Sequence, residues 1–282
     1  MTDASVNRPA SSEAGLSASR DVVLRLRDAT LGYGARELWS GVDLDLHAGE
    51  FVAVLGANGS GKTSLLKAIL GQQSLTSGEL SVLGEPVRRG NRRIGYIPQQ
   101  KLADDGTPLR ARDLIRLGLD GHRWGVPLPS AKRRRETDAL LAAVGATAYG
   151  DAPISSLSGG EQQRLRVGQA LAGDPALLLC DEPLIALDLA HQAAVSELID
   201  RHRRERNLGV LFVTHDVNPV LGMVDRVLYL AGGKFRVGPP DEVLRSEVLS
   251  ELYDAPVDVI RARGRIIVVG TPDHSHAHEE AS

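Results

Sequence analysis

A glycine-rich stretch followed by lysine and threonine is the strongest chemical signal in the sequence. It reads Gly56-Ala57-Asn58-Gly59-Ser60-Gly61-Lys62-Thr63, which matches the pattern G-x-x-x-x-G-K-[ST] at every fixed position. Glycines allow a tight turn whose backbone N–H groups point at phosphate oxygens, and the dipole of the following helix favours the anion. The lysine ammonium can reach the β- and γ-phosphates, and the Thr63 hydroxyl can ligate Mg²⁺. The stretch therefore predicts a phosphate loop that binds a nucleoside triphosphate.

The segments on either side of this loop supply the context that it needs. Residues 50–55 (EFVAVL) form an apolar, β-rich run, which predicts a buried strand. Ser64 then opens residues 64–70 (SLLKAIL), whose apolar residues recur at helical spacing. Strand, loop and helix in this order make an ordinary glycine turn the weaker interpretation, because such a turn would not require the lysine and the threonine.

Two adjacent carboxylates, Asp181 and Glu182, follow a second apolar run at residues 176–180 (ALLLC). In a parallel α/β sheet, ligands gather at the carboxyl ends of the strands. Asp181 can hold Mg²⁺ directly or through water, and Glu182 can accept a proton from an attacking water. The alternative is that both acids cap a following helix. With a phosphate loop upstream, we expect metal binding at Asp181 and general-base catalysis at Glu182.

Two further polar side chains follow apolar runs. His215 comes after residues 209–214 (GVLFVT), where it can sense the γ-phosphate, although a lone histidine in such a place is more often structural. Gln99 follows residues 93–97 (RIGYI) and offers an uncharged amide to water and Mg²⁺. Gln100 is chemically equivalent, so the spacing alone does not choose between the two glutamines.

A serine and two glycines begin a helical segment further along the chain, in the run Leu157-Ser158-Gly159-Gly160-Glu161. A hydroxyl, bare N–H groups and the helix dipole together form a second anion site. One chain has no evident use for two phosphate-binding helix ends. Two chains arranged head to tail would use both, each lending this helix to the nucleotide of the other.

The pattern of apolar residues predicts an α/β fold with two sheets. An antiparallel sheet is expected at the start of the chain, from residues 21–27 and 39–46, and a parallel sheet begins at the strand before the phosphate loop. Residues 80–83 are a further short segment that follows a turn. Between about residues 101 and 160 the sequence changes to helices and loops, with Ser130 as one helix N-cap. Further expected elements are turns at 32–34 and 76–79, helices at 161–172 and 190–206, a hairpin at 226–237, a short helix from Pro239 and a final hairpin at 257–269.

Charge and cysteine content limit the function classes. The chain has 33 Lys and Arg against 36 Asp and Glu, which argues against a dedicated nucleic-acid binder. The single cysteine, Cys180, excludes an intramolecular disulfide and is expected to be a small buried hydrophobe in a reducing compartment. No apolar run approaches the roughly 20 residues that cross a bilayer, and residues 1–20 lack the apolar core of a secretory signal. We therefore expect a cytosolic protein that acts at a membrane only through partners.

The phosphate loop, the run 157–161, the acid pair and His215 occur in the order found in the ATP-binding subunits of ABC transporters, and the sequence resembles that family over about residues 21–245. The resemblance implies a P-loop NTPase with a mixed, parallel core sheet, an N-terminal antiparallel β subdomain and an inserted α-helical signature subdomain. It implies ATP and Mg²⁺ as cofactors. Tyr33 would stack on adenine, Gln99 would lie in the loop that couples to membrane subunits, and Asp188 would lie in the loop that crosses a dimer interface. The implied binding and catalytic residues are Tyr33, residues 56–64 including Lys62, Gln99, Ser158, Gly159, Gly160, Asp181, Glu182, Asp188 and His215, with Thr63, Gln99 and Asp181 around the metal.

The resemblance also implies an organisation and a set of partners. The expected units are a disordered lead over 1–20, an ATPase domain over 21–247 with its helical subdomain at about 101–160, a C-terminal extension with a β-hairpin over 248–270, and a histidine-containing tail over 271–282. The expected partners are a second copy of the chain in a head-to-tail ATP sandwich, two polytopic membrane permease subunits and an extracytoplasmic substrate-binding protein, at the cytoplasmic face of the membrane. Nucleic acid is not an expected partner.

The cargo is predicted from finer similarity. Residues 94–125 and the run 214–220 (THDVNPV) are most similar to the branch of the family that takes up zinc and manganese. Import of an iron–siderophore or another solute is the alternative, and an ABC ATPase acting on nucleic acid is a more distant one. His274, His276 and His278 are compatible with transient metal binding, and equally with no role.

Overall fold

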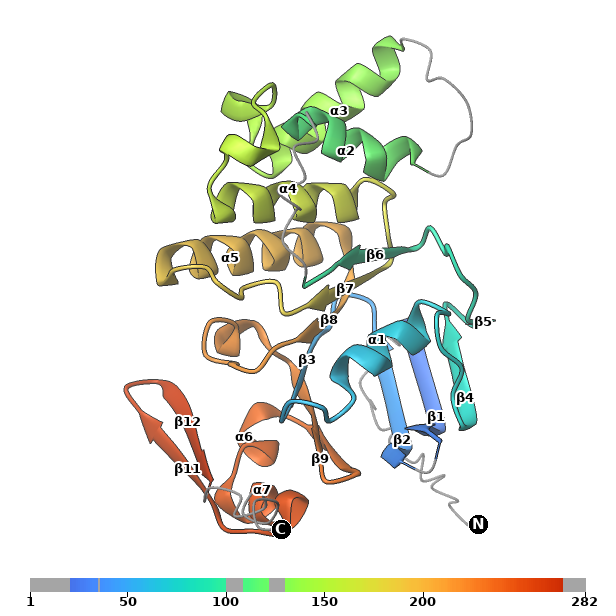
Figure 1. Ribbon diagram of the computed structural model, residues 1–282, viewed down its shortest axis with the longest axis vertical. Helices are drawn as coiled ribbons and strands as arrows, with labels where there is room; N and C mark the ends of the chain where they lie inside the picture. The colour runs from blue at the N-terminus through green and yellow to red at the C-terminus, as the bar shows by residue number, and fades with distance from the viewer. Residues whose placement is uncertain (1–20, 35, 100–108, 122–129, 271–282) are drawn as a thin grey trace, which may run out of the picture.

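The computed structural model of the chain describes residues 21–34, 36–99, 109–121 and 130–270 (Figure 1). The predictions for the lead, for Gln100 and for the histidine tail lie outside these described residues. The strands of the described part form three sheets, of four, six and two strands.

The predicted antiparallel sheet forms from the first part of the chain. Its strands are β1 (Val22–Tyr33), β2 (Arg36–His47), β4 (Ser77–Val82) and β5 (Glu85–Pro86), in the order β2-β1-β4-β5. Leucines alternate with polar residues in β1 and β2, so that Leu24 pairs with Leu46 and Leu26 pairs with Leu44. One face of this sheet is therefore apolar and buried.

The central sheet has the strand order β10-β9-β3-β8-β7-β6. Its strands are β3 (Phe51–Gly56), β6 (Ile94–Ile97), β7 (Leu177–Asp181), β8 (Gly209–Val213), β9 (Arg226–Ala231) and β10 (Lys234–Gly238). All neighbours pair in parallel except β9 and β10, which form the predicted hairpin. Every residue of β7 and β8 is buried, as expected for parallel strands covered on both faces.

The two faces of the central sheet belong to two hydrophobic cores. Along β3, Phe51 and Ala53 face the core that contains the helices, whereas Val52 and Val54 face the core shared with the antiparallel sheet. This alternation follows from the two-residue period of a strand. Cys180 lies fully buried in the helical core, as predicted, and burial raises the pKa of its thiol.

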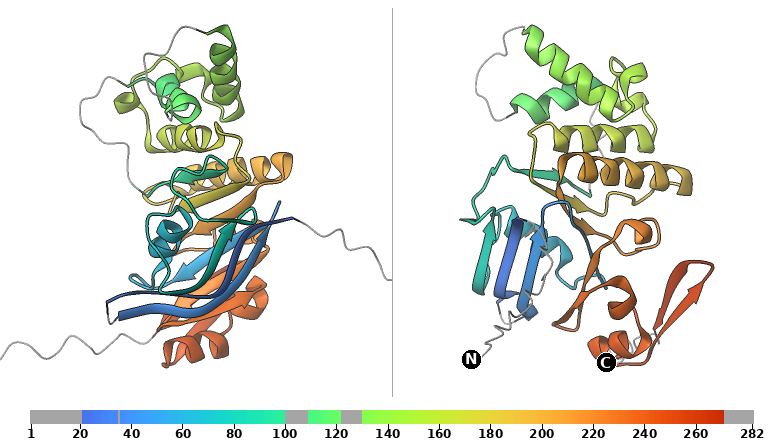
Figure 2. Two further views of the ribbon diagram at one scale, coloured as in Figure 1. Left: turned by 90° about the vertical axis from the view of Figure 1, so that its right-hand side faces the viewer. Right: turned by 180° about the vertical axis from the view of Figure 1, so that it is seen from behind.

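The helices surround the central sheet. They are α1 (Lys62–Ile69), α2 (Ala111–Asp120), α3 (Ala131–Ala143), α4 (Gly159–Leu171), α5 (Leu189–Arg206), α6 (Pro240–Val243) and α7 (Ser246–Tyr253), with 3₁₀ turns at Thr147–Tyr149, Ile154–Ser156 and Leu221–Met223. In Figures 1 and 2, α4 and α5 are stacked on each other, α2 and α3 lie beyond α4, and α1 lies beside the antiparallel sheet. Gly168 lets α4 approach α2 closely, because a Cβ there would lie 2.6 Å from Ile115 Cδ1.

The α/β fold class is confirmed, and the differences from prediction concern the ends of elements. The predicted turn at 32–34 is confined to Gly34, because β1 continues to Tyr33, where it pairs with Arg36. The predicted turn at 76–79 is wrong from Ser77 onward, because β4 already pairs with β1 there. The partner of Tyr33 follows directly after the turn, whereas Ser77 pairs with Thr30 in a distant part of the chain, which local sequence does not reveal.

Other differences concern helices. α4 begins at Gly159 rather than at Glu161, because Ser158 is its N-cap. Sequence periodicity did not predict α7, which is short, nor the two-residue strand β5. Since α4 packs against α2 and α3, the helical layer continues past residue 160; the division of the chain into domains stays a prediction.

The last described segment is a two-stranded sheet of β11 (Val257–Ala262) and β12 (Arg265–Gly270), which is the predicted final hairpin. Within the described part of the chain, none of the helices has both the length and the apolar character that crossing a bilayer requires. The same residues bring together no group of three or more His, Cys, Asp or Glu side chains suited to a metal ion.

We expect Gly209→Ala to destabilise the fold by about 1–3 kcal/mol, because a Cβ at this position would overlap the buried side chains of Leu46 and Val23 where the two sheets meet. Gly222→Ala is the matched control, since a Cβ there meets nothing within 4 Å; its effect should stay within about 0.5 kcal/mol. Urea unfolding of both variants measures the difference. Equal midpoints would contradict the close approach of the sheets at Gly209.

Candidate active site

The glycine-rich stretch forms the turn between β3 and α1, and its backbone conformation explains its glycines. Gly56, Gly59 and Gly61 have φ values of 143°, 78° and 93°, in the region that residues with a side chain avoid. A Cβ at Gly56 would overlap the carbonyl oxygen of Leu230, and one at Gly61 would lie 2.7 Å from Trp39 Nε1. Glycine is thus required both by conformation and by close packing.

Lys62 is the first residue of α1, and its ammonium lies inside the loop. Nζ donates to Gly56 O at 2.7 Å and to Ala57 O at 2.9 Å. Burial lowers the pKa of Lys62, while the carboxylates of Glu182 and Asp181 act in the opposite direction. The lysine is therefore held by carbonyl oxygens that phosphate oxygens can replace.

Asp181 ends β7 and is 2% exposed. Its carboxylate accepts hydrogen bonds from Thr63 Oγ1 and from Tyr96 OH, each at 3.4 Å. Burial raises the pKa of Asp181, and no cationic side chain among the described residues forms an ion pair with it. A buried carboxylate with two long hydrogen bonds is weakly compensated, which suits a cation.

Tyr96 is a site residue that sequence reasoning missed. It lies in β6 and pairs with Leu179 of β7, two residues before Asp181. Burial, together with the neighbouring carboxylate, raises the pKa of Tyr96 to about 12, so its hydroxyl remains a hydrogen-bond donor at neutral pH. The available signal was one hydroxyl in an otherwise apolar strand next to the acid pair, and this signal becomes specific only once β6 and β7 are known to be neighbours.

Glu182 and His215 follow the adjacent strands β7 and β8, and their side chains meet. Glu182 Oε2 lies 3.2 Å from His215 Nδ1; the carboxylate side chain is 13% exposed and the imidazole 60%. Glu182 has a φ of 46°, and its N–H donates to Val213 O at 2.9 Å. A left-handed conformation at a non-glycine residue is costly and is found mostly at functional sites. The bend at the end of β7 sets a largely buried carboxylate beside an exposed imidazole.

Two other predicted residues lie at the edge of this group. Tyr33 is 53% exposed; its hydroxyl donates to Gln73 Oε1 at 2.6 Å and lies 3.3 Å from Ser64 Oγ. Its ring therefore stands beside the start of α1. Gln99 is exposed two residues beyond β6, and among the described residues its amide makes no hydrogen bond with Asp181.

Ser158 caps α4 with a reciprocal pair of hydrogen bonds. Its Oγ accepts from Glu161 N at 3.3 Å and donates to Glu161 Oε2 at 2.8 Å, while Ser158 N donates to the same Oε2 at 2.9 Å. These hydrogen bonds, the backbone one first, lower the pKa of Glu161. The capping box fixes the start of the helix, and the N–H groups of Gly159 and Gly160 have no intrahelical acceptor.

Asp188 caps α5, and His191 links it to the start of α4. Asp188 accepts from His191 N at 2.9 Å and lies 2.8 Å from His191 Nδ1. The backbone hydrogen bond from His191 is the main cause that lowers the pKa of Asp188. The His191 ring packs so closely on Gly160 that a Cβ there would overlap it. Sequence reasoning missed His191, because only the folded chain brings α5 against α4.

The predicted residues thus fall into two groups, which one chain does not bring together. The phosphate-loop group comprises residues 56–64, Asp181, Glu182 and His215, and the signature group comprises Ser158, Gly159, Gly160 and Asp188. α1 packs in the core shared with the antiparallel sheet, whereas α4 packs in the core on the opposite face of the central sheet (Figure 1). Among the described residues, no hydrogen bond or ion pair joins the two groups.

The phosphate-loop group fits a magnesium nucleotide by its chemistry. Ser60 Oγ is buried and finds no hydrogen-bond partner among the described residues. The first N–H groups of α1 have no intrahelical acceptor, so the loop offers several donors to an anion. The oxygens of Thr63 and Asp181 are ligands of the kind that Mg²⁺ prefers.

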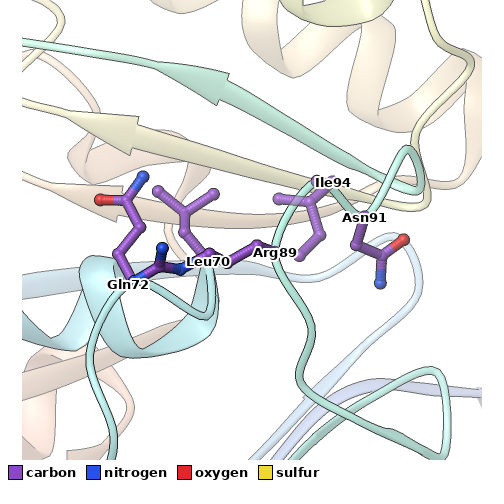
Figure 3. Close-up of a pocket in the computed structure, with 6 residues that line it drawn as sticks. Leu70, Gln72, Arg89, Asn91 and Ile94 are labelled. Carbon is purple, nitrogen blue, oxygen red and sulfur yellow. The ribbon is translucent and has the colours of Figure 1, made fainter. Parts of the chain in front are cut away.

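A cavity on the surface lies away from this chemistry. It has a volume of about 560 Å³ and is lined by Leu70, Gln72, Arg89, Gly90, Asn91 and Ile94 (Figure 3). Leu70 follows the last residue of α1, whereas the phosphate loop precedes the first. None of the predicted site residues lines this cavity, so cavity size does not mark the site.

Comparison with known proteins agrees with this geometry. A family model described as ABC transporter matches residues 39–185. The zinc import ATP-binding protein ZnuC of Magnetococcus marinus is 33% identical over 244 residues, which cover 86% of this chain and 86% of that protein. The protein of the same name from Brucella melitensis is 35% identical over 261 residues, 93% of this chain and 79% of that protein.

Solved structures give the same result for the fold. A metal-chelate-type ABC transporter in an inward-facing conformation matches with a TM-score of 0.74 and 27% identity, over 89% of this chain and 98% of that one. CbiO1 of Clostridium perfringens, part of the ABC transporter complex cbiONQ, matches with a TM-score of 0.69 at 23% identity, over 82% and 94% of the two chains; at that identity the likeness concerns the fold alone. Sequence, fold and the arrangement of the phosphate loop agree, and the chain belongs to the ABC transporter family, as one of its ATP-binding subunits.

Proposed function

We propose that the chain is the ATP-hydrolysing subunit of an ABC importer for a divalent metal ion, zinc or manganese. The proposed cargo is supported by the 33% and 35% identity to zinc import ATP-binding proteins over 86% and 93% of the chain. Import of a chelated metal, such as an iron–siderophore, is the second candidate, because the metal-chelate-type transporter subunit is 27% identical over 89% of the chain.

ATP would bind with its phosphates over residues 56–63. Lys62 would exchange its hydrogen bonds to Gly56 O and Ala57 O for bonds to the β- and γ-phosphate oxygens, so that neutral acceptors would be replaced by anionic ones. The exposed ring of Tyr33, beside the start of α1, would stack on adenine. Thr63 and Asp181, with Gln99, would hold Mg²⁺, which neutralises charge on the phosphates when bound.

Glu182 would act as the general base. Its carboxylate would accept a proton from the attacking water as the water oxygen bonds to the γ-phosphorus and ADP leaves. His215, 3.2 Å from Glu182 Oε2, would orient this carboxylate and reach the γ-phosphate with its exposed edge. The 13% exposure of the Glu182 side chain supports this role, since a largely dry base competes less with bulk water.

The second anion site would serve another molecule of the same chain. Helices α1 and α4, which follow the phosphate loop and Ser158, pack on opposite faces of the central sheet, so one chain would not close around ATP with both groups. In a head-to-tail dimer, Ser158, Gly159 and Gly160 of one copy would contact the γ-phosphate held by the other, and Asp188 would lie at the interface. ATP binding would close the dimer, and hydrolysis would reopen it.

The dimer would work at the cytoplasmic face of the membrane, bound to two permease subunits. Gln99, exposed between β6 and α2, would connect the nucleotide to the permease contact. An extracytoplasmic substrate-binding protein would deliver the metal to the permease subunits.

We expect Tyr96→Phe to weaken the apparent Mg²⁺ affinity of the ATPase about tenfold, because the variant removes a hydrogen bond that orients the Asp181 carboxylate. Titration of Mg²⁺ at saturating ATP measures the effect. ATP binding measured in EDTA is the control, and it should not change. A magnesium titration identical to that of the unsubstituted protein would contradict the role of the tyrosine.

Cargo is tested in a strain that lacks the gene for this chain. We expect growth under metal chelation to fail, and to be restored by added zinc or manganese and by the plasmid-borne gene, but not by its Glu182→Gln form. Uptake of radiolabelled zinc, manganese and ferric siderophore then separates the two candidates. Loss of ferric-siderophore uptake alone would favour the second candidate, and unchanged uptake of all three would contradict an import function.

A further inference from the structure

The hairpin of β11 and β12 carries an apolar face that no other part of the described chain covers. Ile260, Ile267 and Val269 are 50%, 49% and 48% exposed. Ile260 pairs with Ile267, and Val269, whose cross-strand partner is the exposed Asp258, lies two residues further along β12, so the three apolar side chains share one face. Val257 and Ile266, on the opposite face, are only 5% exposed because they pack into the core. Adjacent apolar residues across a strand pair, unlike scattered ones, indicate a contact surface.

This hairpin lies next to the phosphate-loop group. A cavity of about 380 Å³ is lined on one side by Gly56, Ala57 and His215 and on the other by Ile267 and Val268. Figure 1 shows the hairpin projecting on the same side of the molecule as the starts of α4 and α5. The hairpin therefore lies beside the phosphate-loop group and on the side of the signature group, which are the two groups that a head-to-tail partner would contact.

The hairpin is held in a fixed position rather than attached only through its chain. Asn218 Nδ2 donates to Ile266 O at 2.9 Å, and Ile266 N donates to Asn218 Oδ1 at 2.8 Å. Arg261 forms an ion pair with Asp241 at 2.8 Å. A surface that is already ordered loses little conformational entropy on binding, which favours association.

We propose that Ile260, Ile267 and Val269 form a contact surface for a second copy of this chain and become buried when two chains close over ATP. This inference rests on the proposed head-to-tail dimer. A permease is the less suitable occupant, because the hairpin lies at the end of the molecule opposite α2 and α3, and Gln99 leads toward α2 (Figure 1). The two hydrogen bonds of Asn218 join the hairpin to the segment that follows His215. Burial of the hairpin would therefore affect the position of His215, the residue beside the general base.

The test uses Glu182→Gln as the parent, because this form is expected to retain ATP in a closed dimer. Ile267→Ser and Val269→Ser are combined in the parent, and dimerisation with ATP and Mg²⁺ is measured by sedimentation velocity. We expect the dimer dissociation constant to rise at least about tenfold, since each serine removes apolar area that the dimer would bury. Leu117→Ser in the same parent is the matched control, because Leu117 is equally exposed, at 51%, but lies on α2.

The outcomes separate this inference from the proposed function. A parent that stays monomeric with ATP refutes the head-to-tail dimer itself. A parent that dimerises as tightly with the two serines as without them refutes only the hairpin surface, as does a variant that loses permease binding while its dimer is unchanged. Because the double-serine variant could misfold, amide hydrogen exchange of residues 257–270 is also measured in the parent without the serines. ATP should slow the exchange of these residues, and an unchanged exchange rate would overturn the proposal.

Discussion

Glu182→Gln is expected to lower the rate of ATP hydrolysis at least about 100-fold while leaving ATP binding intact. The amide keeps the size of the carboxylate but cannot accept a proton from water, and general bases typically contribute 10²- to 10⁴-fold. The carboxylate lies 3.2 Å from His215 Nδ1 and is largely buried, so the change removes a positioned base rather than a surface charge. Phosphate release in a single turnover, with ATP bound in advance, isolates the chemical step.

Glu197→Gln is the control for this substitution. Glu197 is an exposed residue of α5, and the same chemical change there should leave hydrolysis unaltered. Single-turnover hydrolysis by Glu182→Gln at a rate within a few-fold of the unsubstituted protein would refute general-base catalysis by this residue. Loss of ATP binding in the variant would instead assign Glu182 to the binding of nucleotide.

Lys62→Ala is expected to weaken ATP binding about 10- to 100-fold and to lower turnover at least about 100-fold. The binding loss corresponds to one charge-assisted hydrogen bond, worth about 1.5–3 kcal/mol. The loss of turnover reflects the positive charge that the transition state requires at the β- and γ-phosphates. Equilibrium binding of a fluorescent ATP analogue and steady-state hydrolysis measure the two effects separately.

The control for Lys62→Ala lies on the same helix. Lys67 is exposed in the last turn of α1, so Lys67→Ala removes one lysine from α1 without touching the loop. Because Lys62 also bridges Gly56 O and Ala57 O, the thermal stability of both variants should be compared. A folded Lys62→Ala protein with normal turnover would exclude contact between this lysine and the transferred phosphate.

The sequence alone was sufficient for the features that are local in the chain. The motif of residues 56–63 predicted a glycine turn between strand and helix, and three of its glycines have positive φ. Ser130 was predicted as a helix N-cap, and it accepts a hydrogen bond from Arg133 N. Periodicity predicted the buried strands, because both faces of a parallel sheet must be apolar.

Features that depend on which elements are neighbours could not be predicted in this way. Tyr96 contacts Asp181 because β6 pairs with β7, and His191 contacts Gly160 because α5 packs on α4. The positive φ of Glu182 carries no sequence signal, because glutamate is an unfavourable residue for that conformation and is held there by the fold.

Cys180 makes the protein well suited to site-specific labelling. The thiolate is the reactive form of cysteine, and complete burial raises the pKa of this thiol, so alkylating reagents should not react with Cys180. A fluorophore or spin label would then attach only to a cysteine introduced on the surface. Distance measurements between two such labels could follow the closing and reopening of the dimer in a protein whose native core has not been altered.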